Sequence, residues 1–471
     1  MKINLAQNKN FKLFKIISKV AQENNQTVYI VGGYVRDLLM QRKVPTDIDF
    51  VTEQSGIELA KSVGKELGDL KVSIFKTYGT AMIKYKDLDL EFVGARKESY
   101  SEDSRKPAVE TGTLEDDQKR RDFTVNALAI SLNSENFGEL IDPFKGREDM
   151  QNKILRTPLE PAQTYSDDPL RMMRAIRFAS VLHFEIEENS LEAIKQEAER
   201  IKIVSMERIM VEFNKIMLSE KPSVGLKLME KTTLLEKIIP ELTALKGIEE
   251  VEGQTHKDNF WHTLEVVDNI SKNTNKLWLR WAALLHDIGK APTKKFVEKI
   301  GWTFHGHEFL GSKMVKNLFT RLKLPLGTDM KYVQKMVKLS SRPIALIDDG
   351  TSDSALRRLL FDAGEDLEDL FTLCKADITT KNSQKQEKFK KNFEYVAKKI
   401  KEVEKKDQVR NFQPPISGEE IMELFNLKPG REIGILKEKV KEAILEGIIA
   451  NDKDEARNFV IKEAKLLGLE L

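Results

Sequence analysis

A double glycine followed closely by two aspartates constrains the fold of this chain more than any other feature. The apolar, β-branched run at residues 27–31 predicts a strand that ends at the glycines. Gly32 and Gly33 let the backbone turn tightly and approach a ligand. Residues 35–40 predict a helix, whose free N–H groups would face a phosphate bound at the turn.

Asp47 and Asp49 flank Ile48 in the next apolar run of the chain. In a strand, residues two positions apart point to the same side, so the two carboxylates would share one face. Adjacent carboxylates repel each other unless a cation lies between them, and Mg²⁺ prefers such hard oxygen ligands. Alone, a glycine turn or an aspartate pair is more often an ordinary turn or a solvated loop. Their close succession favours a site for nucleotidyl transfer, which needs both.

A third carboxylate follows further along the chain. Residues 79–85 and 88–93 alternate in polarity and predict a hairpin. Glu91 would join the aspartate pair if these strands are neighbours, although an ordinary solvent-facing residue fits the pattern equally well. Residues 97–119 are polar and show no periodicity, which predicts a mobile loop.

The segment that begins at residue 120 offers groups suited to a nucleotide. The Arg120 and Arg121 guanidiniums can bind triphosphate oxygens through charge-assisted, bidentate hydrogen bonds. Asp122 and Asn126 can accept hydrogen bonds from ribose hydroxyls or donate to them. As an isolated pattern, such a cluster is usually a surface salt bridge.

A helix predicted near Asp168 carries a row of arginines. Arg171, Arg174 and Arg177 are spaced three apart and therefore lie along one helix face. Asp168 and Arg171 have the same spacing, and a carboxylate beside a guanidinium can bind the Watson–Crick edge of a base. An ordinary ion pair on a helix surface is the alternative.

Histidines concentrate in the middle of the chain. Five of the six lie within residues 256–307, where His286 is followed directly by Asp287. Histidine and aspartate side chains from several helices suit a borderline or hard divalent metal. A single histidine is more often structural, but this concentration predicts a second metal site.

Composition limits the class of protein. A chain of 471 residues is too long for one ordinary core, and about three domains are expected. Charged residues make up 32% but the net charge is only +2, so any nucleic-acid surface must be local. The lone Cys374 excludes an internal disulfide and indicates a reducing compartment. Without a membrane-length apolar run or a secretory signal pattern, a cytoplasmic location is expected.

The order of these motifs resembles the class II tRNA nucleotidyltransferase and bacterial poly(A) polymerase family. The resemblance covers nearly the whole chain and is carried by residues 32–37, 47–49, 121–127 and 168–171. One position departs from the pattern. The family often has Glu-Asp where this chain has Asp167-Asp168, a difference that bears on the base pocket and on nucleotide preference.

The resemblance implies a role for each motif of the head. Asp47 and Asp49 would bind the catalytic Mg²⁺ ions, and Gly33 and Arg36 would hold the triphosphate. One Mg²⁺ would activate a tRNA 3′-hydroxyl for attack on the α-phosphorus of CTP or ATP, and a second would steady the departing pyrophosphate. Catalysis of this kind relies mainly on positioning and charge neutralisation.

The same resemblance assigns the nucleotide pocket. Asp122 and its arginine neighbours would lie on the ribose side of the nucleotide. Asp168 and Arg171 would select C or A without a nucleic-acid template, and Arg174 and Arg177 would complete the pocket. Residues 97–119 resemble the flexible loop needed to switch from CTP to ATP.

The histidine region resembles an HD phosphohydrolase domain, with Gly306-His307-Glu308 at the place expected in that family. The resemblance implies a divalent metal held by five residues: His262, His286, Asp287, His307 and Asp377. His256 and His305 would be bystanders or phosphate contacts. Both a residual phosphohydrolase activity and a purely structural role in positioning tRNA are compatible with this set.

We therefore expect an α+β fold with four regions. They are a polymerase β-like nucleotidyltransferase head (1–148), a helical neck for base recognition and RNA binding (149–250), an all-helical HD domain (251–385) and a helical basic tail that binds tRNA (386–471). Residues 381–410 hold eleven Lys/Arg against five Asp/Glu, and their lysines would make salt-dependent phosphate contacts. Residues 417–422 and 429–434 resemble the tRNA-contacting end of bacterial family members.

The function implied is addition of C, C and A to the 3′ end of tRNA from CTP and ATP. A poly(A) polymerase would share every head motif, and a CC-adding enzyme would stop after two cytidines. Because CC-only members of the family tend to lack the loop at 97–119, its presence favours full CCA addition. In a different class, the chain would act chiefly as an HD phosphohydrolase, and Asp47→Ala would then spare the main activity while His286→Ala abolished it. The sequence leaves the oligomeric state open.

Overall fold

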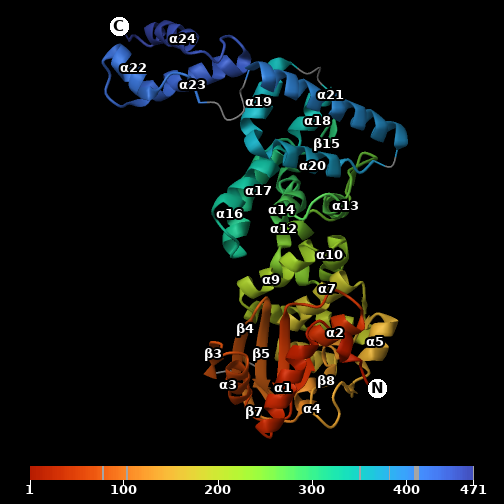
Figure 1. Cartoon of the computed structure of the whole chain (residues 1–471). Coiled ribbons are helices and arrows are strands. Elements are labelled where there is room, and N and C mark those ends of the chain that lie inside the picture. The colour runs from red at the N-terminus through yellow and green to blue at the C-terminus, as the bar shows by residue number, and fades with distance from the viewer. Residues whose placement is uncertain (77–78, 102–103, 349–351, 381, 408–412, 470–471) are drawn as a thin grey trace. The chain divides into compact units, whose positions relative to one another are not determined.

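The computed structural model describes residues 1–76, 79–101, 104–348, 352–380, 382–407 and 413–469 of the chain. It divides into two compact units, Met1–Pro240 and Glu241–Leu471. Figure 1 shows a mixed sheet with surrounding helices in the first unit, and a second unit made mostly of helices. This arrangement confirms the predicted α+β fold class.

The head sheet positions the candidate carboxylates. Its strand order is β3-β4-β5-β2-β1-β8-β9. The strands are β1 (Tyr29–Val31), β2 (Asp47–Thr52), β3 (Val72–Phe75), β4 (Thr80–Tyr85), β5 (Leu88–Gly94), β8 (Ala129–Ser131) and β9 (Leu140–Ile141). Neighbouring strands are antiparallel except β2 and β5, which are parallel. The predicted first strand, the aspartate strand and the β4–β5 hairpin are therefore confirmed.

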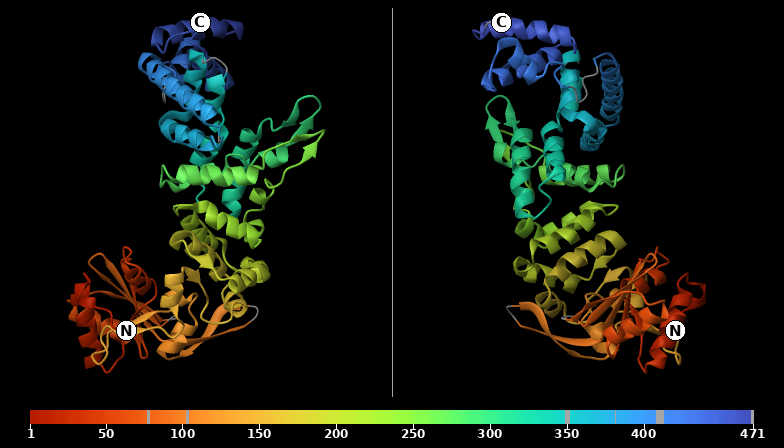
Figure 2. Two further views of the ribbon diagram at one scale, coloured as in Figure 1. Left: turned by 90° about the vertical axis from the view of Figure 1, so that its right-hand side faces the viewer. Right: turned by 60° about the vertical axis from the view of Figure 1, so that its left-hand side comes forward.

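Alternation along β2 and β5 separates an apolar face from a carboxylate face. Ile48 and Phe50 on β2, and Leu90 and Phe92 on β5, are fully buried. The rings of Phe50 and Phe92 stack with their centroids 5.0 Å apart. Helices α1 (Phe11–Glu23) and α3 (Gly56–Glu66) belong to the same core, and Figure 2 shows these red segments packed against the head strands. Because side chains alternate in a strand, Asp47, Asp49 and Glu91 project from the opposite face.

The remaining helices of the first unit follow the sheet strands or form the neck. They are α2 (Gly33–Leu39), α4 (Leu114–Lys119), α5 (Gly146–Asn152), α6 (Pro161–Asp167), α7 (Leu170–Leu182), α8 (Glu188–Glu197), α9 (Met206–Met217), α10 (Pro222–Lys231) and α11 (Leu234–Ile238). Short 3₁₀ turns occur at Leu5–Gln7, Thr124–Asn126 and Ala198–Ile203, and β10 (Ile154–Leu155) pairs with β11 (Glu185–Ile186). Helix α12 (Pro240–Thr243) begins at the last residue of the unit.

The segment predicted as a mobile loop, residues 97–119, contains regular secondary structure in its described residues, 97–101 and 104–119, so the prediction of a loop is wrong there. Strands β6 (Arg96–Ser101) and β7 (Ser104–Thr111) pair as an antiparallel hairpin, and α4 follows at once. The sequence of these two strands shows no apolar alternation from which a hairpin could have been predicted. A readable signal does mark the start of α4, because Thr113 and Asp116 form a capping box.

In its described residues, the second unit is helical apart from two short hairpins. Its helices are α13 (Asn259–Ser271), α14 (Leu277–Leu285), α15 (Lys290–Thr293), α16 (His307–Arg321), α17 (Thr328–Leu339), α18 (Arg342–Asp348), α19 (Asp353–Ala363), α20 (Leu367–Asp377), α21 (Ser383–Asp407), α22 (Gly418–Phe425), α23 (Arg431–Glu446) and α24 (Lys453–Leu466), with a 3₁₀ turn at Gly364–Asp366. The hairpins pair β12 (Glu250–Val251) with β13 (Gln254–Thr255) and β14 (Lys295–Val297) with β15 (Gly301–Thr303).

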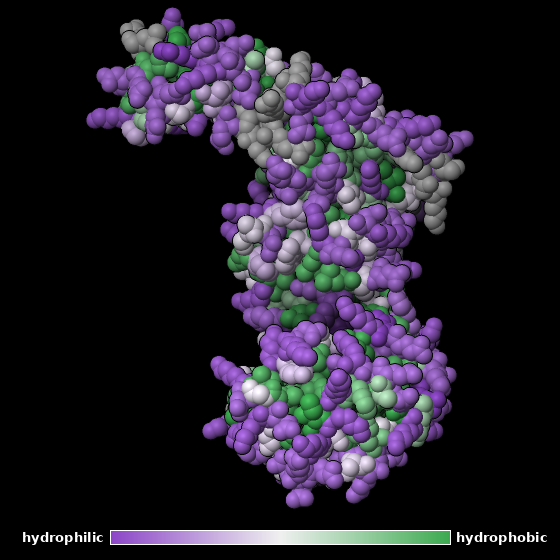
Figure 3. All heavy atoms as spheres, in the orientation of Figure 1, coloured by the Kyte–Doolittle hydropathy of each residue, from purple (hydrophilic) through white to green (hydrophobic). Residues whose placement is uncertain are grey.

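Among the residues that the structure describes, none of the helices combines the length and apolarity needed to cross a membrane. Hydrophilic side chains dominate the face of the molecule that Figure 3 displays.

Candidate functional site

Three carboxylates meet on one face of the head sheet. Asp49 lies directly opposite Glu91 in the parallel register of β2 and β5, and Asp47 lies two residues before Asp49 on the same strand. Burial is the main cause that raises the pKa of Asp49, and Asp47 adds to it while Arg121 opposes it. Burial and the charge of Asp49 likewise raise the pKa of Glu91. Burial and the neighbouring carboxylates thus disfavour the ionised forms of Asp49 and Glu91, a cost that a bound cation would offset.

A tight backbone turn at the double glycine lies against this cluster. Gly32 has φ +75° and lies at the N-cap of α2. A Cβ atom at Gly32 would lie 3.0 Å from Arg121 Nη1 and 3.3 Å from Asp49 Oδ2. Only glycine fits both the backbone conformation and the close approach. Gly33 is the first residue of the helix.

A chain of hydrogen bonds connects this loop to the neck. The Arg36 Nη1 group donates to Asn126 Oδ1 at 2.7 Å, and Asn126 Nδ2 donates to Asp122 Oδ1 at 3.0 Å. On the other side of the carboxylate, Arg174 Nε donates to Asp122 Oδ2 at 2.7 Å. Residues from α2, from the segment before β8 and from α7 are thus joined in one network.

The electrostatics of this network depend on Asp122. Burial alone would raise its pKa, but the Arg174 guanidinium and the Asn126 amide outweigh burial and lower the pKa to about 2. Arg36 and Arg174 also lie near the Phe178 ring, with their Cζ atoms 4.9 and 5.4 Å from its centroid. A fixed anion among fixed cations holds the arginine donors in place before any ligand binds.

Arg171 and Asp168 occupy the junction between head and neck. Arg171 Nη2 donates to the Arg120 carbonyl at 2.5 Å, which ties α7 to the arginine pair. Asp168 precedes α7 in extended conformation, with φ −135°, and its Oδ1 accepts a hydrogen bond from Leu170 N. Asp168 is not helical because Pro169 disfavours the α conformation in the residue before it.

The Arg177 side chain contacts the neck helix α9 and not the head segment. Its guanidinium forms an ion pair with the buried Glu212 of α9, and its Cζ atom lies 3.7 Å from the Phe178 centroid. Of the arginines on α7, Arg171 and Arg174 therefore contact the head segment at 120–122, whereas Arg177 is bound to the neck helix.

The residues of the head fit a divalent metal and a triphosphate. Asp47, Asp49 and Glu91 provide the oxygen donors that Mg²⁺ prefers. Arg36 and Arg121 provide cationic donors beside the Gly32 turn. The geometry thus brings the predicted head residues into one region.

The second candidate site gathers residues from four helices. His262 belongs to α13, His286 and Asp287 follow α14, His307 starts α16 and Asp377 ends α20. A glycine is required here too. A Cβ atom at Gly289 would lie 2.1 Å from the His307 carbonyl oxygen, so only glycine lets the turn after Asp287 approach α16 this closely.

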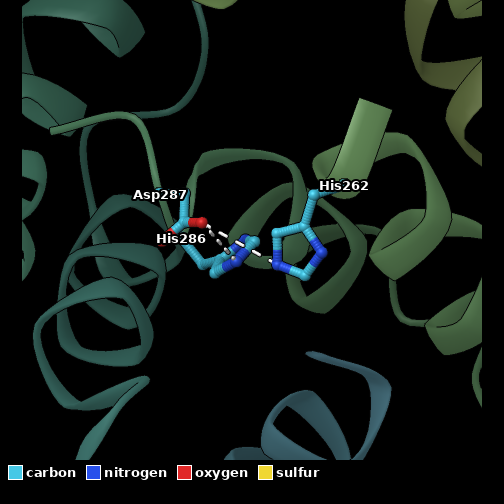
Figure 4. Close-up of side chains that lie close together, drawn as sticks. All are labelled: His262, His286 and Asp287. Atoms are coloured by element: carbon cyan, nitrogen blue, oxygen red, sulfur yellow. Dashed lines mark ion pairs between the residues drawn. The ribbon is translucent and has the colours of Figure 1, made fainter. Parts of the chain in front are cut away.

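The imidazole Nε2 atoms converge on the two carboxylates. His262 Nε2 lies 2.7 Å from Asp377 Oδ1, and His286 Nε2 lies 3.3 Å from Asp287 Oδ2 and 3.4 Å from Asp377 Oδ1. His307 Nε2 lies 3.5 Å from Asp287 Oδ1. Figure 4 shows His262, His286 and Asp287 turned toward one another, and these three side chains offer ligand atoms that all lie within 4.8 Å of one another.

Hydrogen bonds to the far side of two rings prepare them to bind a metal. His286 Nδ1 lies 2.8 Å from the Ala283 carbonyl and His307 Nδ1 lies 2.9 Å from the Phe304 carbonyl. A proton on Nδ1 leaves the Nε2 lone pair for a metal. His286 Nε2 is buried, and it is a nitrogen without a hydrogen-bond partner among the described residues. Burial lowers the pKa of His286, but Asp287 and Asp377 outweigh it and raise the pKa to about 10, so without a metal Nε2 also carries a proton, which a bound metal would displace.

The environment of His262 differs. Lys257 Nζ lies 2.7 Å from its Nδ1, and Thr379 Oγ1 lies 3.2 Å from the same atom. An ammonium can only donate, so this contact places the proton on Nε2, where it faces Asp377. For His262 to bind a metal through Nε2, Lys257 must give up this contact. The residue types otherwise fit a divalent ion.

The other two histidines of the region lie apart from this set. His256 Nδ1 lies 2.9 Å from the Lys257 carbonyl, and its ring packs against Trp302 with centroids 5.0 Å apart. His305 is exposed. Their expected role as bystanders or phosphate contacts remains a prediction.

Two buried acids near the head site escape the sequence analysis. Asp117 on α4 pairs with Arg120 and Arg121, and Glu212 on α9 pairs with Arg177. The capping box that starts α4 could have revealed a helix around Asp117. Glu212 lies on the buried side of α9 beside Phe213 and Ile216, at a position where a helical pattern calls for an apolar residue.

Three protein-family models match the chain in sequence order. The Poly A polymerase head domain matches residues 28–156, and the probable RNA and SrmB-binding site of polymerase A matches 183–246. The HD domain matches residues 259–379, which contain all five candidate ligands of the second site.

Curated relatives carry three different activities in their names. An A-adding tRNA nucleotidyltransferase of Aquifex aeolicus is 34% identical over 61% of this chain, and the chain spans only 34% of that longer protein. A CCA-adding enzyme of Bacillus velezensis is 30% identical over 95% of this chain and 97% of its own length. A CC-adding tRNA nucleotidyltransferase of Thermus thermophilus is 29% identical over 92% of each chain.

Solved structures share the fold. A tRNA nucleotidyltransferase complexed with a primer tRNA and an incoming ATP analog matches with a TM-score of 0.58 and 26% identity. The match covers 81% of this chain and 98% of that one.

Proposed function

Because this chain belongs to the class II tRNA nucleotidyltransferase and poly(A) polymerase family, we propose that it adds C, C and A to the 3′ end of tRNA. The observation that carries the proposal is the hydrogen-bonded chain from Arg36 through Asn126 and Asp122 to Arg174. It runs from the glycine turn beside the carboxylates to the helix that also carries Arg171, and a nucleotide bound along it would meet both.

Each part of this arrangement has a chemical task. Asp47, Asp49 and Glu91 would hold Mg²⁺, which lowers the pKa of a bound hydroxyl and neutralises charge on transferring phosphates. Arg36 and Arg121 donate to triphosphate oxygens. Asp122 and Asn126 fix the ribose side, and Asp168 with Arg171 bind the base edge. Holding the nucleotide in one orientation contributes to catalysis, because its rotational and translational freedom is already lost on binding and need not be lost in the reaction step.

Addition of all three nucleotides is supported by two observations. The CCA-adding relative from Bacillus velezensis matches nearly the full length of both chains. The segment at residues 97–119 is retained, as the β6–β7 hairpin and α4. Relatives named for A addition or CC addition have comparable identity, so these two activities stay as the competing specificities.

A basic helix of the second unit is suited to the tRNA backbone. On α21, Phe393, Val396 and Ile400 are buried, while lysines line the outer side. The exposed lysines with described side chains are Lys388, Lys391, Lys398, Lys401 and Lys405. Such a row would contact phosphates without reading sequence, and its contribution would fall as salt rises. We assign tRNA as its partner.

Two tRNA substrates separate the competing specificities. One ends at the discriminator base and the other already ends in CC, and each is incubated with Mg²⁺ and with CTP, ATP or both. The proposal expects CTP alone to extend the first tRNA by two residues, and ATP alone to extend the second by one. An A-adding enzyme would extend only the second, and a CC-adding enzyme only the first.

The second site supports a further candidate activity, metal-dependent hydrolysis of a phosphate ester. The observation that favours it is the convergence of the His286 and His307 Nε2 atoms on Asp287 and Asp377, with both Nδ1 atoms held by backbone carbonyls. A divalent metal held by these side chains would polarise a phosphoryl oxygen and activate water. Lys290 Nζ, 2.7 Å from Asp287 Oδ2, adds a cation beside the site.

Removing one imidazole tests this activity. His286→Ala should reduce Mn²⁺ binding to the second site at least about tenfold, since a principal nitrogen donor is lost. Hydrolysis of p-nitrophenyl phosphate should disappear, while tRNA extension stays as in the wild type. His183→Ala is the matched control, because that histidine is exposed and belongs to the first unit. Equal Mn²⁺ binding by the two variants would contradict a metal role for His286.

A further inference from the structure

Asp117 is a buried carboxylate that none of the recognised motifs contains. Its side chain is fully buried at the middle of α4. Hydrogen bonds fix α4 near both of its ends. Leu114 N donates to Glu53 Oε1 at 3.0 Å, and Gln118 Nε2 donates to the Ala127 carbonyl at 2.6 Å. Asp117 therefore has a defined position relative to β2 and to the segment that leads into β8.

Two guanidinium groups pair with the Asp117 carboxylate. Arg121 Nε donates to Asp117 Oδ2 at 3.0 Å, and Arg121 Nη2 lies 2.9 Å from the same oxygen. Arg120 Nη2 pairs with the other oxygen, Oδ1. Burial raises the pKa of Asp117, but Arg121 and Arg120 outweigh it and lower the pKa below its usual range. The side chain is thus an anion that is shared by both arginines.

The two arginines lead to opposite ends of the nucleotide pocket. Arg121 Nη1 lies 3.5 Å from the Asn126 carbonyl and would be 3.0 Å from a Cβ atom at Gly32, on the triphosphate side. The Arg120 carbonyl accepts the hydrogen bond from Arg171 Nη2, on the base side. One carboxylate therefore anchors a turn whose side chain and backbone both reach the pocket.

Asp117 also competes with Asp49 for the same cation. A Cβ atom at Gly32 would lie 3.0 Å from Arg121 Nη1 and 3.3 Å from Asp49 Oδ2, so this guanidinium and this carboxylate both lie against the glycine turn. A guanidinium released from Asp117 would be drawn to Asp49, where it would compete with a metal ion for the carboxylate. The contacts of Arg121 with Asp117 hold its Nε and Nη2 groups on the side of α4.

We propose that Asp117 is a positioning residue of the nucleotide pocket, which holds Arg121 away from Asp49 and, through the Arg120 backbone, orients Arg171. This inference rests on the proposed nucleotidyl transfer. Loss of the anchor should weaken triphosphate binding, raise the Mg²⁺ requirement and reduce selection among bases, whereas a residue needed only for folding would change none of these in the folded fraction.

The test is Asp117→Asn, with Glu115→Gln as the matched control. Glu115 lies on the same helix, is exposed and pairs with Lys119, so its variant removes the same charge away from the pocket. For Asp117→Asn we expect the dissociation constant of Mg·ATP and the half-saturating Mg²⁺ concentration to rise about tenfold or more, since charge-assisted hydrogen bonds are lost. Incorporation of U or G into tRNA should increase relative to C and A, and Glu115→Gln should match the wild type.

Binding of Mg·ATP is measured by calorimetry without tRNA, so it reports on Asp117 even if the wild type extends no tRNA, a result that would overturn the proposed function alone. Wild-type values of ATP affinity and Mg²⁺ requirement in a folded Asp117→Asn protein would overturn the inference. Should that variant not fold, Asp117→Glu keeps the charge but shifts the carboxylate by one methylene. It should raise the same two constants several-fold, and unchanged constants would count equally against the proposal.

Discussion

Asp49→Asn should reduce nucleotidyl transfer at least about 10³-fold, the largest effect expected of a single substitution in this chain. The amide keeps the shape of the side chain but cannot provide the anionic oxygen that Mg²⁺ requires. Asp49 faces Glu91 across β2 and β5, with Asp47 on the same strand, so the loss falls at the centre of the cluster. Initial rates of tRNA extension at saturating Mg²⁺ measure it.

The same substitution should leave the fold intact. Because the pKa of Asp49 is raised in the folded state, folding favours its neutral form more than the unfolded chain does. The stabilisation that belongs to this shift is present at acid pH and lost as pH rises, so the ionised carboxylate carries a cost at neutral pH that asparagine avoids. Thermal stability without Mg²⁺ should be equal or higher. Asp69→Asn, at an exposed left-handed position, is the control that keeps activity. Retention of a tenth or more of wild-type activity by Asp49→Asn would contradict the assigned role.

Arg174→Ala should lower both activity and stability. It removes the guanidinium that bonds to Asp122 and leaves the buried carboxylate with fewer charged partners. We expect the unfolding free energy of the first unit to fall by about 2 kcal/mol, less than for a fully buried pair because Arg174 is partly exposed. Extension of tRNA should fall at least about tenfold in kcat/KM, since charge-assisted contacts are lost.

The four tryptophans allow the stability change caused by Arg174→Ala to be measured for each unit separately. Trp261, Trp278, Trp281 and Trp302 all lie in the second unit. Urea unfolding followed by circular dichroism should therefore show a shifted transition for Arg174→Ala, while tryptophan fluorescence reports a transition that does not move. A double variant, Asp122→Asn with Arg174→Ala, should recover part of the stability but none of the activity. Recovery of activity would mean that the pair serves only the fold.

Acid pH provides an independent check on the same ion pair. The pKa of Asp122 is lowered to about 2, so its contribution is present above the ordinary pKa of about 4 and is lost as pH falls toward 2. In Arg174→Ala the unfolding free energy should fall less between these pH values, because without the guanidinium the pKa of Asp122 is lowered less.

Local patterns in the sequence predict the centre of the head site well. The glycine turn, the helix after it and the aspartate strand follow from residues that are neighbours in sequence, and the structure confirms all three. Glu91 is different. Its approach to Asp49 depends on parallel pairing of β2 with β5, a register that links segments forty residues apart and that a sequence leaves open.

The errors have identifiable physical causes. The β6–β7 hairpin was missed because the sequence of its strands shows no alternation of apolar and polar residues. Asp117 and Glu212 were missed because a sequence does not reveal that an acidic side chain is buried against an arginine. At the second site, ligand types were evident, but their convergence depends on the packing of four helices.

Product length on a single substrate tests the central claim most directly. Wild-type chain, Mg²⁺, CTP and ATP are added to a tRNA that ends at its discriminator base, and the products are resolved at single-nucleotide resolution. The account predicts growth by three residues, C, C and A, followed by arrest. A long adenosine tail, or a tRNA that remains unextended while phosphate esters are hydrolysed, would contradict it.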